Sequence, residues 1–249
     1  MDKPEGLSLQ RGVQRDFRMN LNKIVTGETI EKYEKKKRHY QSDSIASKYD
    51  DVRFIKHSHR MRNKRKLAAI QRAISAAAAL GSEIKNVIDI PCGTGRLFPL
   101  FIDNKISFTG ADISKEMMEV SRNRFEKSGL LNGMVRCDAE FLPFRDRSFD
   151  SVASIRFMFH VPKEVRHNIL KEMARISKGW LIIDYRHRYT VKYFIKKSLN
   201  TLGIGRPPSY RFSVSDLQNE LNSAGIKIVR IFPTLPLFSD KWVVLCKTN

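Results

Sequence analysis

The 249-residue sequence predicts an α/β fold: a seven-stranded, mostly parallel sheet with an antiparallel last strand, helices on both faces, and a basic helical extension at the N-terminus. Three observations support this. After Gly81, short apolar runs of strand length alternate with longer runs of helical periodicity, as in βαβ units. The final two apolar runs are joined by only eight residues, 233–240, which suits an antiparallel pair at the sheet edge. Before Gly81 the chain is helix-permissive and rich in lysine and arginine.

The expected elements follow one another in a regular order. Strands are expected at 86–90, 106–114, 133–140, 148–157, 179–186, 226–232 and 241–247. Helices are expected at 67–80, from 96 onward, and at 115–129, 162–179 and 213–225. Gly81 is a natural stop for the first helix, and the last helix carries a capping-box pattern from Ser215 to Gln218.

The chain divides into an extension and one domain. Residues 1–44 are expected to form a basic N-terminal extension, partly helical or disordered, and residues 45–249 a single domain. At the start of that domain, Ile45, Tyr49 and Val52 have helical spacing, so one helical face there could dock on a partner. The run 56–66 is the densest basic stretch of the chain.

Composition narrows the class of partner. The net charge of +20 favours anionic partners such as RNA, anionic lipid head groups or acidic small molecules, although a merely basic soluble surface is the alternative. No apolar run reaches the length of a membrane span, and the N-terminus lacks a secretory signal. The three cysteines are isolated, without metal-ligand spacing. We therefore expect a cytoplasmic protein without a metal site, with peripheral contact at the inner face of the membrane as a further possibility.

The loop after the first strand is the most informative stretch. It reads DIPCGTGR from Asp89 and contains Pro91, Gly93 and Gly95. The dinucleotide fingerprint GxGxxG fails, because its third glycine position is Phe98, and the phosphate-loop pattern GxxxxGK[ST] is also absent. An acidic residue in such a loop suits a ligand with positive charge better than a pyrophosphate.

DIPCGTGR resembles the first motif of the class I S-adenosylmethionine-dependent methyltransferases, and the resemblance covers roughly residues 45–249. The later motifs occur in the family's order: GADIS, CDAEFLPFRDRSFD, SIRFMFHV, LKEMARISKGWLII and RFSVSDLQNELNSAGI. The sequence departs from the family at Pro91, where glycine is usual, and at 177–179, which lack the usual Pro-Gly. Proline removes one backbone donor but keeps φ negative, so the turn can survive.

The resemblance implies a Rossmann-like fold and S-adenosyl-L-methionine as the cofactor. Backbone N–H groups near Gly93 and Gly95 would meet the cofactor's carboxylate, Asp89 its ammonium group, and Asp112 its two ribose hydroxyls. Either Asp138 or the Ala139 N–H would bind the adenine edge. The predicted cofactor-binding set is Asp89, Pro91, Gly93, Gly95, Asp112, Ile113, Asp138 and Ala139. The alternative role for the three acids is capping, since each comes where a strand ends.

Candidate residues for the acceptor side follow the fourth and fifth strands. His160 matches the position of a frequent histidine of the family, and we expect a general base or a substrate contact there; the alternative is a helix-entry residue. Arg156 is expected to hold an anionic substrate group, unless it is a surface charge at a strand end. Tyr185 is a third candidate, for which simple packing is the main alternative.

The segment 186–211 is an insert that class I methyltransferases often use to cover the substrate. It combines lysine and arginine with aromatic and apolar residues and contains no Asp or Glu. It suits an anionic bilayer or an RNA, or it is an ordinary lid helix with a solvated basic face.

Three functions compete for this sequence. The leading interpretation is methyl transfer to an anionic non-protein acceptor, such as a membrane-associated lipid, glycolipid or quinone-like molecule. The alternative is an RNA methyltransferase, acting on tRNA, although no NPPY- or DPPY-type tetrapeptide follows the fourth strand. A third hypothesis, a non-catalytic binding subunit, conflicts with the intact set of Asp89, Gly93, Gly95 and Asp112.

Overall fold

In the computed structural model, the described residues are 30, 31, 33–35, 37, 38, 57–204, 211–236 and 238–248. The chain falls into two units, Met1–His39 and Tyr40–Asn249. In the first unit the described residues are helical, with Tyr33 buried and the Lys37 Nζ 3.9 Å from the Glu34 carboxylate. Most of the expected extension 1–44, and the helical face at residues 45, 49 and 52, lie outside the described residues.

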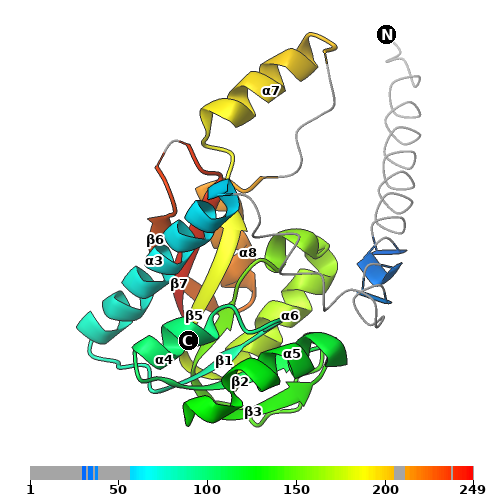
Figure 1. The fold of residues 1–249 in the computed structure, drawn as a ribbon. Helices are drawn as coiled ribbons and strands as arrows, with labels where there is room; N and C mark the ends of the chain where they lie inside the picture. The colour runs from blue at the N-terminus through cyan, green and yellow to red at the C-terminus, as the bar shows by residue number, and fades with distance from the viewer. Residues whose placement is uncertain are drawn as a thin grey trace, which may run out of the picture. The chain divides into compact units, whose positions relative to one another are not determined.

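The second unit contains the expected seven-stranded sheet, in the order β3-β2-β1-β4-β5-β7-β6 (Figure 1). The strands are β1 (Asn86–Asp89), β2 (Ser107–Asp112), β3 (Leu131–Arg136), β4 (Phe149–Ser154), β5 (Ser177–Arg186), β6 (Ile226–Pro233) and β7 (Lys241–Thr248). The pairs from β3 across to β5 are parallel, whereas β7 runs antiparallel to both β5 and β6. The expected antiparallel pair therefore forms, with β6 at the edge and β7 inside the sheet.

Helices cover both faces of the sheet, as the alternating pattern predicts. The helices are α3 (His57–Ala79), α4 (Phe98–Asp103), α5 (Lys115–Phe125), α6 (Lys163–Ile176), α7 (Val191–Thr201) and α8 (Val214–Ser223), with short 3₁₀ turns η1 (Glu126–Ser128) and η2 (Met158–His160). Apolar side chains of α3, α4 and α5 share one buried cluster with the sheet residues Trp180, Ile182 and Leu245. On the other face, Arg166 of α6 and Glu220 of α8 pack near Tyr185.

The alternation of β5 decides which of its residues can share a site. Successive residues of a strand point to opposite faces. Trp180 and Ile182 join the α3 cluster, so Asp184 and Arg186 project from that same face, while Tyr185 points toward α6 and α8. Tyr185 is fully buried, its ring lies 4.9 Å from that of Phe212, and its hydroxyl donates to Glu220. This arrangement favours packing over catalysis for Tyr185.

Two local expectations need correction. The capping box of α8 is formed by Ser213 and Asp216, not by Ser215 and Gln218, because the helix begins at Val214, directly after Ser213. The Ser213 hydroxyl accepts the Asp216 N–H at 3.0 Å, and the Asp216 carboxylate accepts the Ser213 N–H at 2.9 Å. In addition, α3 begins at His57, so nearly all of the basic run 56–66 is helical and continuous with the apolar stripe that follows it.

Within the described part of the chain, the helices are too short or too polar to cross a bilayer.

Candidate functional site

The predicted cofactor residues gather at the carboxyl edge of the parallel strands, beside the point where the strand order reverses. β1 lies between β2 and β4: the chain runs outward from β1 to β2 and β3, and then returns to β4 on the other side of β1. In open α/β sheets, ligands bind in the crevice at such a switch point. The loop after β1 is hydrogen-bonded to the strands on both sides of β1. The Ile90 N–H donates to the Ala153 carbonyl of β4 and the Cys92 N–H to the Ala111 carbonyl of β2, each at 2.9 Å.

Asp112, the last residue of β2, organises this edge. Its Oδ2 accepts the Gly93 N–H at 2.7 Å and its Oδ1 accepts the Ser114 N–H at 2.9 Å, so one carboxylate ties the β1 loop to the start of α5. The side chain is buried. Burial raises the pKa of Asp112, and the hydrogen bonds from the Ser114 and Gly93 N–H groups oppose that rise.

Asp89, the last residue of β1, is a buried carboxylate of a different kind. It is 2% exposed, and among the described residues no donor or cation contacts its oxygens. Burial, followed by the nearby charge of Asp112, raises the pKa of Asp89 well above its ordinary value. A buried acid without a partner is costly, and a bound cationic group would supply the missing partner.

The two glycines of the loop have different tasks. Both have positive φ, +53° at Gly93 and +75° at Gly95, which favours glycine. A Cβ on Gly95 would lie 2.4 Å from the Ser121 Oγ, so this glycine also lets the loop approach α5 closely. Their N–H groups donate within the protein, Gly93 to Asp112 and Gly95 to the Cys92 carbonyl at 3.0 Å. A ligand carboxylate would therefore compete with Asp112 for the Gly93 N–H.

The other predicted cofactor residues lie around this centre. Pro91 follows a cis peptide bond in the β1 loop, and Ile113 follows Asp112 directly. The Cys137 N–H donates to the Asp112 carbonyl at 3.0 Å, which brings the end of β3 beside the end of β2. Asp138 and Ala139 come next along the chain, and the Asp138 Oδ1 accepts the Glu140 N–H at 3.1 Å.

The residues present fit an S-adenosylmethionine molecule. The buried, unpartnered Asp89 offers a negative charge to its cationic end. Asp112 would offer its carboxylate to hydroxyl groups in place of a backbone N–H, and Asp138 and Ala139 follow the neighbouring strand β3. This assignment of individual residues remains a prediction.

The predicted acceptor-side residues lie at the carboxyl end of β4. His160 closes η2, is exposed, and has its ring centroid 4.4 Å from that of Phe159. Arg156 adopts a positive φ of +67° two residues after β4, and its backbone N–H donates to the Asp184 Oδ1 at 2.5 Å. Thus the backbone of Arg156 is held by a residue that sequence reasoning did not single out.

Asp184 is the centre of a basic cluster, which consists of Lys66, Arg156, Arg186 and Lys241. The Lys66 Nζ, from α3, forms a buried ion pair with the Asp184 carboxylate. Arg186 lies two residues along β5 on the same face, and its antiparallel partner in the register is Lys241 of β7. The Arg186 guanidinium stacks on the Phe159 ring, with Cζ 4.4 Å from the centroid, which links the cluster to η2.

The basic cluster has more positive charge than Asp184 neutralises. Among the described residues, the Arg186 Nε is buried without a hydrogen-bond partner, and Lys241 forms no ion pair. Burial, followed by the charge of Lys66, lowers the pKa of Lys241 to about 8. Burial also lowers the pKa of Lys66, against the opposing effect of Asp184. An anion would relieve this repulsion.

The basic cluster was missed because its members come from four separate segments. Lys66 was counted only in a basic run, Arg186 as the last residue of a strand and the start of the insert, and Asp184 and Lys241 as ordinary strand residues. A partial signal existed: an Asp and an Arg at alternate positions of the fifth strand share one face at its carboxyl end.

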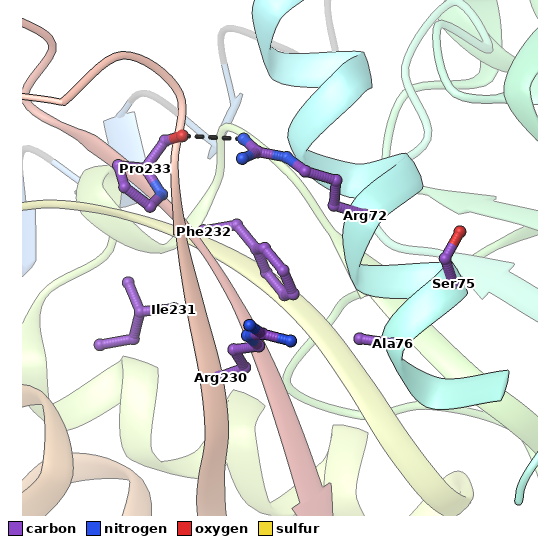
Figure 2. A pocket seen from close by; sticks show the side chains of 7 residues that line it. All are labelled: Arg72, Ser75, Ala76, Arg230, Ile231, Phe232 and Pro233. Atoms are coloured by element: carbon purple, nitrogen blue, oxygen red, sulfur yellow. Dashed lines mark hydrogen bonds between the residues drawn. The ribbon is translucent and has the colours of Figure 1, made fainter. Parts of the chain in front are cut away.

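A hollow lies elsewhere, beside the edge strand β6. It has a volume of about 450 Å³ and is lined by Arg72, Ser75, Ala76, Arg230, Ile231, Phe232 and Pro233 (Figure 2). Both arginines lie near the Phe232 ring, and Arg72 also donates to the Pro233 carbonyl at 3.0 Å. β5 and β7 separate this hollow from the end of β4, so it is not part of the candidate active site.

Comparison with known proteins shows similarity to methyltransferases over part of this chain. Residues 87–179 match the family model described as a methyltransferase domain. Phosphatidylethanolamine N-methyltransferase of Cereibacter sphaeroides is 32% identical over 114 residues, 45% of this chain and 55% of that protein. The ubiquinone/menaquinone biosynthesis C-methyltransferase UbiE of Burkholderia mallei is 33% identical over 162 residues, 61% of this chain and 60% of that protein. The chain therefore spans less than two thirds of the length of these relatives.

Solved structures agree with the fold. Magnesium protoporphyrin IX methyltransferase from Synechocystis, with bound S-adenosylmethionine, superposes with a TM-score of 0.63 at 15% sequence identity, covering 86% of this chain and 97% of that chain. The motif order, the sheet order and the family match agree. Residues 87–179 therefore match a methyltransferase domain, and the chain has the fold of a solved methyltransferase that binds S-adenosylmethionine.

Proposed function

We propose that the protein transfers a methyl group from S-adenosylmethionine to an anionic non-protein acceptor, with a membrane-associated lipid, glycolipid or quinone-like molecule as the preferred class. The observation that carries the proposal is that two sites of opposite charge lie side by side at the carboxyl ends of the parallel strands. Buried carboxylates, Asp89 and Asp112, follow β1 and β2, whereas the basic cluster lies at the ends of β4 and β5 and the start of β7.

The acidic side would bind the cofactor, which when bound supplies an activated methyl group on a sulfonium. Asp89 would hold the ammonium group, directly or through water, and Asp112 the ribose hydroxyls. Asp112 would then exchange its contact with the Gly93 N–H for the ribose, which frees that N–H for the cofactor carboxylate. Alignment of donor and acceptor contributes most of the rate, and such orientation is worth about 7–11 kcal/mol.

The basic side would orient the acceptor. Arg186 and Lys241 offer charge that no described carboxylate neutralises, so a carboxylate or phosphate group of the acceptor fits there. Arg156 would assist from the end of β4. His160, exposed beside Phe159, is the proposed base or substrate contact for an acceptor that must lose a proton.

The relatives support an acceptor of this kind without choosing it. Their names specify phosphatidylethanolamine, ubiquinone/menaquinone and magnesium protoporphyrin IX as substrates or products. The alternative is tRNA: the probable tRNA methyltransferase 9B of Mus musculus is 37% identical over 91 residues, 36% of this chain and 19% of that protein. The same basic cluster would suit a phosphate of RNA.

The first experiment tests the cofactor site with a matched pair of variants. Asp112→Asn removes the carboxylate from the cofactor edge. Asp150→Asn is the control, because Asp150 also accepts two backbone N–H groups, from Lys85 at 3.0 Å and Asn86 at 2.9 Å, but at the opposite edge of the sheet. We expect S-adenosylmethionine to bind Asp112→Asn about tenfold or more weakly and Asp150→Asn normally. Equal affinities would refute the site.

The second experiment identifies the acceptor class. Purified protein and cofactor with a labelled methyl group are mixed with a cell extract, which is then split into lipid, RNA, protein and small-molecule fractions. Label in lipid or in anionic small molecules supports the proposal, and label in RNA favours the tRNA alternative. Cofactor binding without label in any fraction would favour the non-catalytic hypothesis.

A further inference from the structure

Helix α7 is amphipathic, but its apolar side is exposed instead of packing on the core. Its apolar residues Val191, Phe194, Ile195, Leu199 and Leu202 recur at spacings of three and four, so they share one side. They are 60%, 55%, 54%, 40% and 73% exposed, respectively. The opposite side carries Tyr193 and Asn200, which are only partly exposed. The apolar side of α7 therefore faces solvent, whereas Tyr193 and Asn200 on the opposite side are partly covered.

The fold presents α7 as a separate projection. It lies beyond the end of β5, outside the two helical layers that cover the sheet (Figure 1). The helix is well formed at both ends: the Thr190 hydroxyl accepts the Tyr193 N–H at 3.2 Å, and Gly203 follows the last turn with a φ of +76°. Ile204, 58% exposed, extends the apolar side past the helix.

Clustered exposure of this kind needs an explanation. Single exposed apolar side chains are ordinary, but a contiguous apolar face marks a surface that another phase or molecule covers. Lys196 and Lys197 are exposed on α7, and the insert 186–211 contains no acidic residue. A helix with an exposed apolar face, exposed lysines on its other sides and no negative charge has the composition of a helix that lies in the interface of an anionic membrane.

We propose that the exposed apolar face of α7 inserts into the surface of an anionic lipid bilayer, with the neighbouring lysines at the head groups. The lysine stems are long enough to reach the head groups beside a buried apolar face. α7 begins five residues after Arg186, so docking would bring the basic cluster to the membrane surface. This inference concerns attachment and stands independently of the proposed methyl transfer.

The test measures sedimentation of the full-length protein with vesicles, without cofactor. Vesicles of phosphatidylcholine with phosphatidylglycerol are compared with vesicles of phosphatidylcholine alone, at low and high salt. The variant Phe194→Gln/Ile195→Gln removes apolar surface from α7, and Phe238→Gln is the control, because Phe238 is 80% exposed in the connection between β6 and β7. We expect the α7 variant to bind anionic vesicles about tenfold or more weakly and the control to bind as the wild type does.

Charge reversal tests the electrostatic part. Lys196→Glu/Lys197→Glu should weaken binding to anionic vesicles by roughly 30-fold or more, from the worth of each lysine at such a surface. Lys127→Glu/Lys171→Glu is the control, with the same change of charge at exposed lysines outside α7.

Two outcomes would overturn the inference. One is wild-type vesicle binding by both α7 variants. The other is RNA binding that the lysine variant loses and the Phe194→Gln/Ile195→Gln variant keeps, together with no affinity for vesicles; the insert would then be a nucleic-acid contact. S-adenosylmethionine binding by each variant is measured separately, so a failure of the cofactor site is distinguishable from a failure of membrane attachment.

Discussion

Lys66 of α3 and Asp184 of β5, 118 positions apart in the chain, form a buried ion pair at the edge of the candidate acceptor site. Asp184 also accepts the Arg156 N–H, so one carboxylate joins α3, β5 and the end of β4. Removing one member of a buried ion pair leaves an uncompensated charge, which is strongly destabilising. The pair therefore fixes α3 to the strands that carry the candidate acceptor site.

Replacing only the anion should destabilise the protein more than replacing both members. We expect Asp184→Asn to lower the free energy of unfolding by about 3–5 kcal/mol, measured by urea denaturation, because Lys66 is then buried near other cations without a carboxylate. Lys66→Met/Asp184→Asn should recover much of that loss, because the buried lysine charge is removed and the amide oxygen can still accept the Arg156 N–H. A double variant as unstable as the single one would indicate that the loss comes from packing around Asp184 instead of charge.

Anion binding at the basic cluster should depend on Lys241. Its pKa is lowered to about 8 by burial and by neighbouring cations, so Lys241 loses its charge as the pH rises through that value. A bound anion favours the charged form, and anion affinity therefore falls as the pH rises. Sulfate should raise the Tm more at about pH 7 than at about pH 9.

The conservative variant Lys241→Arg is the control for this pH dependence. Arginine stays protonated throughout the range, so the sulfate-induced rise in Tm should persist at the higher pH. If wild type and Lys241→Arg lose the rise equally, the titrating group is not Lys241.

We expect the charged Asp89 side chain to destabilise the folded protein while it contributes to S-adenosylmethionine binding. Folding raises the pKa of Asp89, so the folded state favours the protonated side chain. The stability that comes from this protonation is lost as the pH rises from the pKa of the unfolded chain through that of the folded protein. Asp89→Asn imitates the protonated form. At neutral pH we expect the variant without cofactor to gain on the order of 1 kcal/mol, or about 2–4 °C in Tm, while its affinity for S-adenosylmethionine falls.

Measurements at acidic pH provide the control for the Asp89 experiment. The difference in Tm between Asp89→Asn and wild type should shrink as the pH falls, because wild-type Asp89 is then protonated as well. A difference that does not change with pH would mean that Asp89 is not the buried charge that destabilises the protein.

Gly95 should resist substitution for two separable reasons. Gly95→Ala strains a positive φ and also places a Cβ 2.4 Å from the Ser121 Oγ and 2.9 Å from the Phe98 and Phe125 rings. Gly129→Ala has a similar φ of +71° but meets nothing within 4 Å, so it measures the backbone strain alone, about 1–2 kcal/mol. Gly95→Ala should cost at least about 1–3 kcal/mol more, by thermal unfolding. Equal losses would mean that the β1 loop moves away from α5 without penalty.

Local and periodic features were predictable from the sequence alone. The strands that end in Asp89 and Asp112, the glycine loop between them and the helices on both faces follow from periods of two and 3.6 residues and from the order of motifs. These features depend on neighbours in the chain or on a pattern within one segment. The capping box of α8 was misplaced because two serines, Ser213 and Ser215, compete for the N-cap position, and only the three-dimensional hydrogen bonds distinguish them.

Only the tertiary structure shows that the residues of the basic cluster come together and that the two buried acids have different contacts. Lys66, Asp184, Arg186 and Lys241 meet because α3 packs on the face of the sheet where β5 and β7 are paired in a particular register. That register follows from side-chain packing across many segments, and no local pattern encodes it. Likewise, Asp89 without a partner and Asp112 holding two backbone N–H groups are alike in the sequence. Burial and long-range contacts give these two acids their different chemistry.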